Sequence, residues 1–331
     1  MKASETPNDI PKTLYHYTDG FGLQGILGPG SGPLQVVIPD KERGKYVDPD
    51  DYTNGKAARF WATDVRYMND TLELRFGLDI VSERLLEASR DESFASALRK
   101  AFAAFAAVFD PDHLFSWPFR CFSVCFCESG DLLSQWRGYA GGVGGFAIGF
   151  PLEVLRHYSY GIHRMALGNR DDMPSRALLV RVAYGEDAAR RQADDLVQDL
   201  AAAFAAGKLL TDVDGTPSMT VALRAFYTIA GVKHKAFAEE REWRLLAISE
   251  RQIVKTRGRA GGLVPYMDVV VNGRLDPNTE HIAEQPVRRI VVGPSPDQKA
   301  QVAGVHDLLA SRGMWGFREV NVEPSSAPFR S

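Results

Sequence analysis

Apolar residues occupy both faces of the segment 122–126, a pattern that predicts a strand covered on both sides and placed centrally in a sheet. Residues 128–131 then break this pattern with turn chemistry, and residues 132–136 predict a short helical turn that presents Arg137 and Tyr139. A glycine-dense loop leads into a second apolar run at 146–150. Because polar and turn-forming residues gather between two hydrophobic strands, we expect a functional site here. A tight surface connection is the alternative.

Other segments predict a sheet covered by helices. Strands are predicted where β-prone residues alternate in character, at 13–18, 58–63, 178–183 and 242–246. Amphipathic or alanine-rich patterns predict helices at 21–27, 71–88, 93–108 and 188–206. At 287–322 a strand, a helix and a second strand follow one another, and their connection would be right-handed if both strands lie in one sheet. These elements predict an α+β fold with a mixed central sheet surrounded by helices and a C-terminal βαβ addition.

The chain has 331 residues, of which 45% are hydrophobic and 24% charged, so it can bury a full core. We expect a flexible N-terminal segment at 1–12, a main α+β domain at 13–285, and the βαβ addition at 286–331 packed on the same domain. A net charge of −3 gives no general attraction to nucleic acid or anionic membranes, and it leaves a local basic groove open. Residues 1–12 lack an apolar signal core and no run of about 18 apolar residues occurs, so we expect a cytoplasmic protein without a membrane partner.

The three cysteines, Cys121, Cys125 and Cys127, share parity and are predicted to point to one face of the central strand. Three thiols on one face suggest zinc. However, structural zinc uses four ligands, and the chain has no CxxC pair or nearby histidine to complete a site. We therefore expect reduced, buried cysteines and no metal.

Polar residues after the central strand are candidates for ligand binding. The guanidinium of Arg137 offers a planar fork that suits phosphate or carboxylate oxygens. Ser134 and Gln135 precede it and would line the same pocket for an anionic or amide-bearing ligand.

A second candidate group lies near residue 242, where a helical pattern ends at Glu240 and a strand follows. Alternation places Glu240, Glu242 and Arg244 on one face of that strand. An internal ion pair of a glutamate with Arg241 or Arg244 would explain these charges. The functional alternative is a catalytic or ribose-binding glutamate whose position is fixed by the sheet.

Five sequence blocks carry a family resemblance: LYHYT, FWATDVRYMND, CFCESGDLLSQWRGYAGGVGGFAIGF, FAEEREWRLL and IVVGP. Together they resemble a large bacterial family catalogued as domain of unknown function 2971, and they are spread over nearly the whole chain. This family label implies no chemistry.

The order of a strand with His16 and Thr18, a tyrosine at 67, and a late strand that begins with a glutamate is similar to ADP-ribosyltransferases of the His-Tyr-Glu type. That resemblance implies a split sheet in which the histidine and tyrosine hold the nicotinamide ribose and ring of NAD, and the glutamate bonds the ribose 2′-hydroxyl. It assigns catalysis to Glu242 and His16. The predicted NAD-binding residues are Tyr67, Thr18, Arg137, Ser134, Gln135 and Glu240.

The chain departs from the transferase pattern in two places. Tyr17 stands where a small residue usually follows the histidine, and residues 32–56 lengthen the spacing to Tyr67. The SQWR block has no counterpart in that pattern.

The transferase resemblance implies an NAD-consuming enzyme that transfers ADP-ribose to a protein or nucleic acid, or hydrolyses NAD, as a bacterial toxin or phage-defence effector. The alternative is a non-catalytic nucleotide-binding sensor or interaction module on the same fold. The sequence specifies neither the acceptor, the oligomeric state nor an antitoxin partner, and it leaves open whether Glu240 or Glu242 faces the site.

Overall fold

The computed structural model describes residues 10–28, 57–68, 71–110, 112, 117, 119–139, 144–163, 173–212, 217–249, 254–259, 261–275, 282–284, 286–312 and 320–328. Within these ranges the protein is an α+β structure built on one mixed sheet of 12 strands. Residues 69–70, the insertion 32–56 and residues 140–143 of the glycine-dense loop lie outside the described residues.

The strands of the described chain are β1 (Thr13–Thr18), β2 (Ala57–Asp64), β3 (Arg120–Cys127), β4 (Phe146–Pro151), β5 (Ser159–His163), β6 (Met173–Arg176), β7 (Leu178–Arg181), β8 (Ala183–Tyr184), β9 (Val232–Lys233), β10 (Glu242–Ser249), β11 (Lys255–Arg259), β12 (Gly262–Asn272), β13 (Arg274–Leu275), β14 (Ile282–Glu284), β15 (Arg289–Val292) and β16 (Asn321–Pro324). The large sheet runs β16-β15-β4-β1-β3-β2-β12-β5-β6, with β10, β7 and β11 attached beside this path. Two short pairs, β8 with β9 and β13 with β14, lie apart from it.

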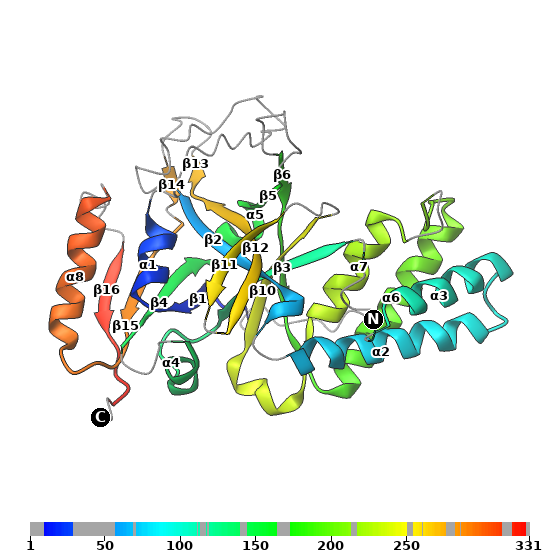
Figure 1. Cartoon of the computed structure of the whole chain (residues 1–331), viewed down its shortest axis with the longest axis horizontal. Coiled ribbons are helices and arrows are strands. Elements are labelled where there is room, and N and C mark those ends of the chain that lie inside the picture. Colours follow the sequence, from blue (N-terminus) through cyan, green and yellow to red (C-terminus); the bar gives the residue numbers. More distant parts are fainter. Residues whose placement is uncertain are drawn as a thin grey trace.

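The helices are α1 (Gly20–Leu27), α2 (Thr71–Arg90), α3 (Ser96–Val108), α4 (Leu133–Tyr139), α5 (Leu152–His157), α6 (Glu186–Ala205), α7 (Met219–Ala230) and α8 (Gln298–Ser311), with 3₁₀ turns η3 (Val65–Tyr67) and η5 (Lys235–Glu240). In Figure 1, α2, α3, α6 and α7 gather at one end of the molecule and α8 lies at the other. The four gathered helices pack on one another and on β3 and β10 through a shared apolar cluster.

The central strand β3 is apolar on both faces, as its sequence predicts. Phe122, Val124 and Phe126 pack into a cluster with helices α1, α5 and α8. On the opposite face Cys121 joins the cluster of α2, α3, α6 and α7, and Cys125 and Cys127 lie farther along the same face. The three cysteines are therefore on one side of the sheet, as their parity predicts, and all three are free thiols.

The sheet divides at β3. One edge of β3 pairs with β10 along its whole length, from Cys127 opposite Glu242 to Arg120 opposite Ser249. The other edge pairs with β1 at Cys127 and with β2 at Phe122 and Ser123. We call this divergence of β1 and β2 along β3 the fork, and Cys125 lies inside it.

The C-terminal strand–helix–strand unit forms as predicted. Its strands β15 and β16 pair in parallel, and β15 also pairs antiparallel with β4, so the unit extends the main sheet. The second strand was predicted to end at Val322, whereas β16 spans Asn321–Pro324. Helix α8 begins where the Asp297 carboxylate accepts a hydrogen bond from the Ala300 amide at 3.1 Å.

One predicted strand is wrong as a single element. The segment 178–183 divides into β7, which pairs with β10, and β8, which pairs with β9. The backbone changes partner at this point: the Val182 amide still bonds the Glu242 carbonyl, and the next amide, that of Ala183, bonds the Gly231 carbonyl. No helix within the described part of the chain is long and apolar enough to span a bilayer.

Two helical glycines give a matched test of this packing. A methyl group at Gly77 in α2 would lie 2.3 Å from the Ile229 carbonyl oxygen of α7, whereas one at the exposed Gly304 in α8 would meet nothing within 4 Å. We expect Gly77→Ala to lower the free energy of unfolding by about 1–3 kcal/mol through overpacking. Gly304→Ala should raise it by up to about 1 kcal/mol through helix propensity. Urea denaturation of both variants measures the difference, and equal changes would contradict the close contact of α2 with α7.

Candidate functional site

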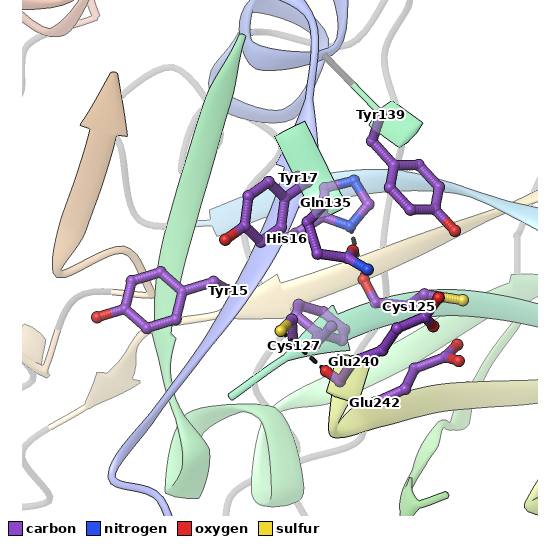
Figure 2. A pocket seen from close by; sticks show the side chains of 10 residues that line it. Tyr15, His16, Tyr17, Cys125, Cys127, Gln135, Tyr139, Glu240 and Glu242 are labelled. Atoms are coloured by element: carbon purple, nitrogen blue, oxygen red, sulfur yellow. Dashed lines mark hydrogen bonds between the residues drawn. The ribbon is translucent and has the colours of Figure 1, made fainter. Parts of the chain in front are cut away.

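A small cavity opens beside the fork, on the face of the sheet that carries Cys125 (Figure 2). Its volume is about 40 Å³, which suits a few water molecules or one small chemical group. A larger hollow of about 290 Å³ shares Cys127 with it. The small cavity is lined by Tyr15, His16, Tyr17, Cys125, Phe126, Cys127, Gln135, Tyr139, Glu240 and Glu242.

His16 lies inside the fork. Its Nδ1 is 2.8 Å from the Cys125 carbonyl oxygen, an acceptor, so Nδ1 carries the proton and Nε2 holds the lone pair of a neutral ring. The ring packs edge-on against Phe60 at a centroid distance of 5.1 Å and also contacts Phe126. Burial lowers the pKa of His16 to about 4, against the opposing effect of the Cys125 hydrogen bond, and the charge of Arg257 lowers it further. The histidine is therefore a neutral hydrogen-bonding group at neutral pH.

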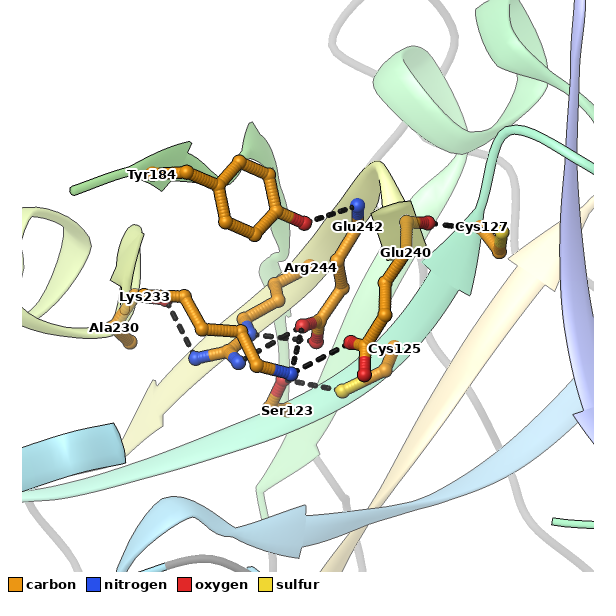
Figure 3. A network of polar contacts seen from close by, with 9 residues as sticks. All are labelled: Ser123, Cys125, Cys127, Tyr184, Ala230, Lys233, Glu240, Glu242 and Arg244. Atoms are coloured by element: carbon orange, nitrogen blue, oxygen red, sulfur yellow. Dashed lines mark hydrogen bonds and ion pairs between the residues drawn. The ribbon is translucent and has the colours of Figure 1, made fainter. Parts of the chain in front are cut away.

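Glu242, the first residue of β10, is the centre of a buried ion network (Figure 3). Arg244 donates two hydrogen bonds to its carboxylate, from Nε to Oε1 at 2.7 Å and from Nη2 to Oε2 at 3.0 Å. The Lys233 ammonium lies 3.1 Å from Oε2. Burial alone would raise the pKa of Glu242, and the charge and hydrogen bonds of Arg244, together with Lys233, outweigh it and lower the pKa to about 2. The carboxylate is thus held in its ionised form, with both oxygens engaged.

Glu240 joins the same network from the end of η5. Its carboxylate accepts a hydrogen bond from Lys233 at 2.6 Å, so one lysine bridges both glutamates. Between them Arg241 adopts a left-handed conformation with φ of 42°. The two cations and two carboxylates balance in charge, which limits the cost of their burial. Both Glu240 and Glu242 line the cavity.

Helix α4 supplies the opposite wall. Gln135 and Tyr139, one turn apart, both line the cavity. Gln135 is 8% exposed, and no group of the described chain forms a hydrogen bond with its amide. Because this amide lines the cavity and its hydrogen-bonding groups are not used within the described chain, Gln135 is a natural contact for a ligand.

Tyr17 explains how the polar turn before α4 is held. Its hydroxyl donates to the Ser129 carbonyl at 2.9 Å and accepts from the Leu132 amide at 2.9 Å, and its ring packs edge-on against Trp136. Tyr17 therefore anchors the turn to β1.

Asp131 fastens the same turn to the C-terminal segment. Its carboxylate accepts hydrogen bonds from Trp136 Nε1 at 2.8 Å and from the backbone amide and hydroxyl of Ser326, both at 2.7 Å. It also accepts one from the Ser325 hydroxyl. Burial alone would raise the pKa of Asp131, and the hydrogen bonds lower it below its usual value. We call this arrangement the Asp131 clasp.

The structure brings four of the predicted site residues together in the cavity: His16, Gln135, Glu240 and Glu242. The other four do not line it. Arg137 is exposed two residues after Gln135, so it points to another side of α4. Ser134 precedes Gln135, and its hydroxyl is buried without a partner in the described chain.

Thr18 and Tyr67 are also absent from the cavity lining. Thr18 ends β1 opposite Phe146 of β4. Tyr67 ends η3, and its carbonyl accepts a hydrogen bond from Arg259 at 3.0 Å.

Sequence reasoning missed Lys233 and Tyr184. Lys233 is 3% exposed, and a lysine in an apolar run is itself a signal that a buried carboxylate lies nearby. The Tyr184 hydroxyl accepts a hydrogen bond from the Glu242 amide at 2.7 Å, a contact between distant segments without a local sequence signal. Among the described residues, no group of three or more histidine, cysteine or acidic side chains is placed to hold a metal ion.

The pKa of Glu242 predicts a specific loss of stability in acid. Because the folded pKa of about 2 lies below its ordinary value of 4.5, the stabilisation is present above pH 4.5 and disappears as the pH falls toward 2. This group should contribute about 3 kcal/mol over that window. Glu242→Gln should lower stability at neutral pH and flatten the pH dependence between 4.5 and 2. Urea titrations across this range measure it, and an unchanged slope in the variant would contradict the ion network.

The pKa of His16 predicts a second loss of stability, at higher pH than that of Glu242. Its folded pKa of about 4 lies below its ordinary 6.5, so unfolding takes up a proton between these values and stability falls as the pH drops from 6.5 to 4. His16→Gln, which cannot be protonated, should remove this component of the wild-type slope. A slope retained in the variant would mean that His16 is already protonated in the folded protein.

The Asp131 clasp predicts that α4 and the C-terminal segment loosen together. Asp131→Ala should increase hydrogen exchange in both segments at once, because it removes acceptors for Trp136, Ser325 and Ser326. Ser326→Ala, which keeps the backbone contact, should have a smaller effect. Faster exchange in the C-terminal segment alone would show that α4 is held by other contacts.

Comparisons with known proteins give one result. No curated protein and no solved structure matched the chain significantly. A family model did match, over part of the chain that includes α4, β4, the ion network and the start of β10. Residues 135–245 match the family described as "Protein of unknown function (DUF2971)", in agreement with the resemblance of the sequence blocks.

Proposed function

We propose that the protein is an NAD-consuming enzyme of the ADP-ribosyltransferase type, which transfers ADP-ribose to a macromolecule or to water. The observation that carries this proposal is the meeting of Glu242 and His16 in one cavity, from strands β10 and β1 on the two sides of β3. The sequence resemblance assigned these two residues to catalysis. The fork in the sheet supports the comparison with a split-sheet fold.

Cleavage of the bond between nicotinamide and ribose requires a negative charge at a fixed position. When the bond between nicotinamide and ribose C1′ breaks, nicotinamide leaves with the electron pair and positive charge develops on the sugar. A carboxylate held ionised beside that carbon stabilises the charge most in the transition state. An oxygen of water or of the acceptor then bonds to C1′ and releases its proton. Glu242 has the required charge because Arg244 and Lys233 keep its pKa near 2.

The remaining lining suits the neutral part of such a ligand. His16 Nε2 offers a hydrogen-bond acceptor, and Gln135 offers an amide that no described group satisfies. The cavity of about 40 Å³ is small beside a dinucleotide, so only the reacting end of NAD would enter it.

One observation favours the second candidate, a non-catalytic nucleotide sensor. Both oxygens of Glu242 already accept hydrogen bonds from Arg244 or Lys233. A carboxylate whose oxygens are both engaged can have a purely structural role. Gln135 would then be the ligand contact.

Release of nicotinamide from NAD, followed by chromatography, separates the two candidates. Glu242→Gln and Lys233→Gln form a matched pair, because each breaks the same buried network and only the first removes the charge assigned to catalysis. We expect wild-type release, a loss of at least about 100-fold in Glu242→Gln, and a much smaller loss in folded Lys233→Gln.

Equal losses in the two variants, at equal stability, would assign Glu242 to the fold and not to the reaction. Absence of wild-type release, combined with NAD binding by calorimetry that Gln135→Leu weakens, would support the sensor. Absence of both release and binding would contradict both candidates.

A further inference from the structure

A second cluster of polar and aromatic side chains lies on the cavity-bearing face of the sheet, across β2, β12 and β11. Thr63 of β2 pairs with Tyr266 of β12 and with Ser123 of β3, which places these side chains on the same face as Cys125. Alternation along the three strands brings further residues to that face. The aromatic-basic surface consists of Trp61, Tyr266, Lys255, Arg257 and Arg259.

Trp61 is the centre of this surface. It is 48% exposed, although large apolar side chains on a sheet are usually covered. Its ring lies 5.2 Å from that of Tyr266, tilted by 40°, and the Arg257 guanidinium lies 5.9 Å from its centroid. Neighbours on two strands therefore hold the half-exposed indole in a defined orientation.

The cations of the aromatic-basic surface differ in whether an acidic side chain pairs with them. Asp268 is 3% exposed and is already paired with Lys255 and, at 2.8 Å, with Arg59. Arg257 is partly buried and donates to the Thr63 hydroxyl at 2.8 Å, and no acidic side chain of the described chain pairs with it. A partly buried guanidinium without a carboxylate partner favours an external anion.

We propose that the aromatic-basic surface binds single-stranded nucleic acid, with a base stacked on Trp61 and phosphates held by Arg257 and its neighbours on β11. Sequence-tolerant binding of single strands combines exposed aromatic rings with a row of cations in this way. Lys255, Arg257 and Arg259 occupy alternate positions of β11, about 6.6 Å apart along the strand. Lys255 is paired with Asp268, so Arg257 and Arg259 are the positions from which cations can follow an extended backbone.

The surface and the cavity lie on the same face of the sheet. Arg257 is close enough to His16 for its charge to lower the histidine pKa. A strand bound at Trp61 would therefore pass near the cavity, although this binding does not depend on the NAD chemistry proposed above. The acceptor of that chemistry would then be within reach on the bound strand.

Fluorescence anisotropy with a labelled 12-nucleotide single strand, DNA or RNA, at 50 mM and 200 mM salt tests this proposal. Trp61→Ala should weaken binding about 5- to 100-fold, the range for loss of one stacking platform. Arg257→Gln should weaken it and reduce the salt slope by about one ion. Phe21→Ala, a change at an aromatic residue 86% exposed on α1, and Arg224→Gln, at an exposed arginine on α7, are matched controls that should bind like the wild type.

Each contrary result overturns the proposal. Circular dichroism of each variant is the control for folding. Absence of wild-type binding at 50 mM salt would exclude the single strand as a ligand. Equal affinity for a duplex or for a mononucleotide would assign the surface to a different ligand. Equal behaviour of Trp61→Ala and Phe21→Ala would remove the stacking role.

Discussion

The buried ion network at the start of β10 is the interaction on which the site depends. Two carboxylates and two cations from β9, η5 and β10 are enclosed beside the central strand, and each charge is acceptable there only because the others are present. Arg244 also ties the network to the end of α7 through a 2.9 Å bond to the Ala230 carbonyl. The helical cluster, the central sheet and the cavity therefore share one electrostatic anchor, which gives the network a structural role whatever the reaction.

Local patterns predicted the elements that are apolar on a regular period. The central strand β3, the helices α1, α2, α3, α6 and α8, and the parallel strands of the C-terminal unit follow from such patterns, whereas α5 and α7 were not predicted. The longest strand, β12, was missed because Pro265 and Asp268 interrupt its apolar pattern. Asp268 is tolerated in the sheet because Arg59 and Lys255 reach it from β2 and β11, and those partners are 209 and 13 residues away in the chain. Compensation of this kind comes from the tertiary structure.

The distinction between local patterns and tertiary structure applies to the site as well. Parity along a single strand correctly grouped Glu242 with Arg244. The cavity itself arises where β1, β3, β10 and α4 meet, and no single segment contains that information. Arg137 was selected for its charge, whereas the neighbouring Gln135 is the residue of α4 that lines the cavity. In the short helix α4, Trp136 and Gln135 are buried, whereas Arg137 is exposed. Burial therefore decides which of these side chains reaches the cavity.

The fork in the sheet has a consequence for how the protein tolerates sequence change. His16 contacts Phe60 and Phe126 in the apolar core below the sheet, and it lines the cavity above. Positions on opposite faces, such as Phe60 and Gln135, are thereby joined through one imidazole ring. Their substitutions should be epistatic: a change in the volume of Phe60 shifts the ring that Gln135 faces, so residue choices at these two positions are expected to vary together over evolutionary time.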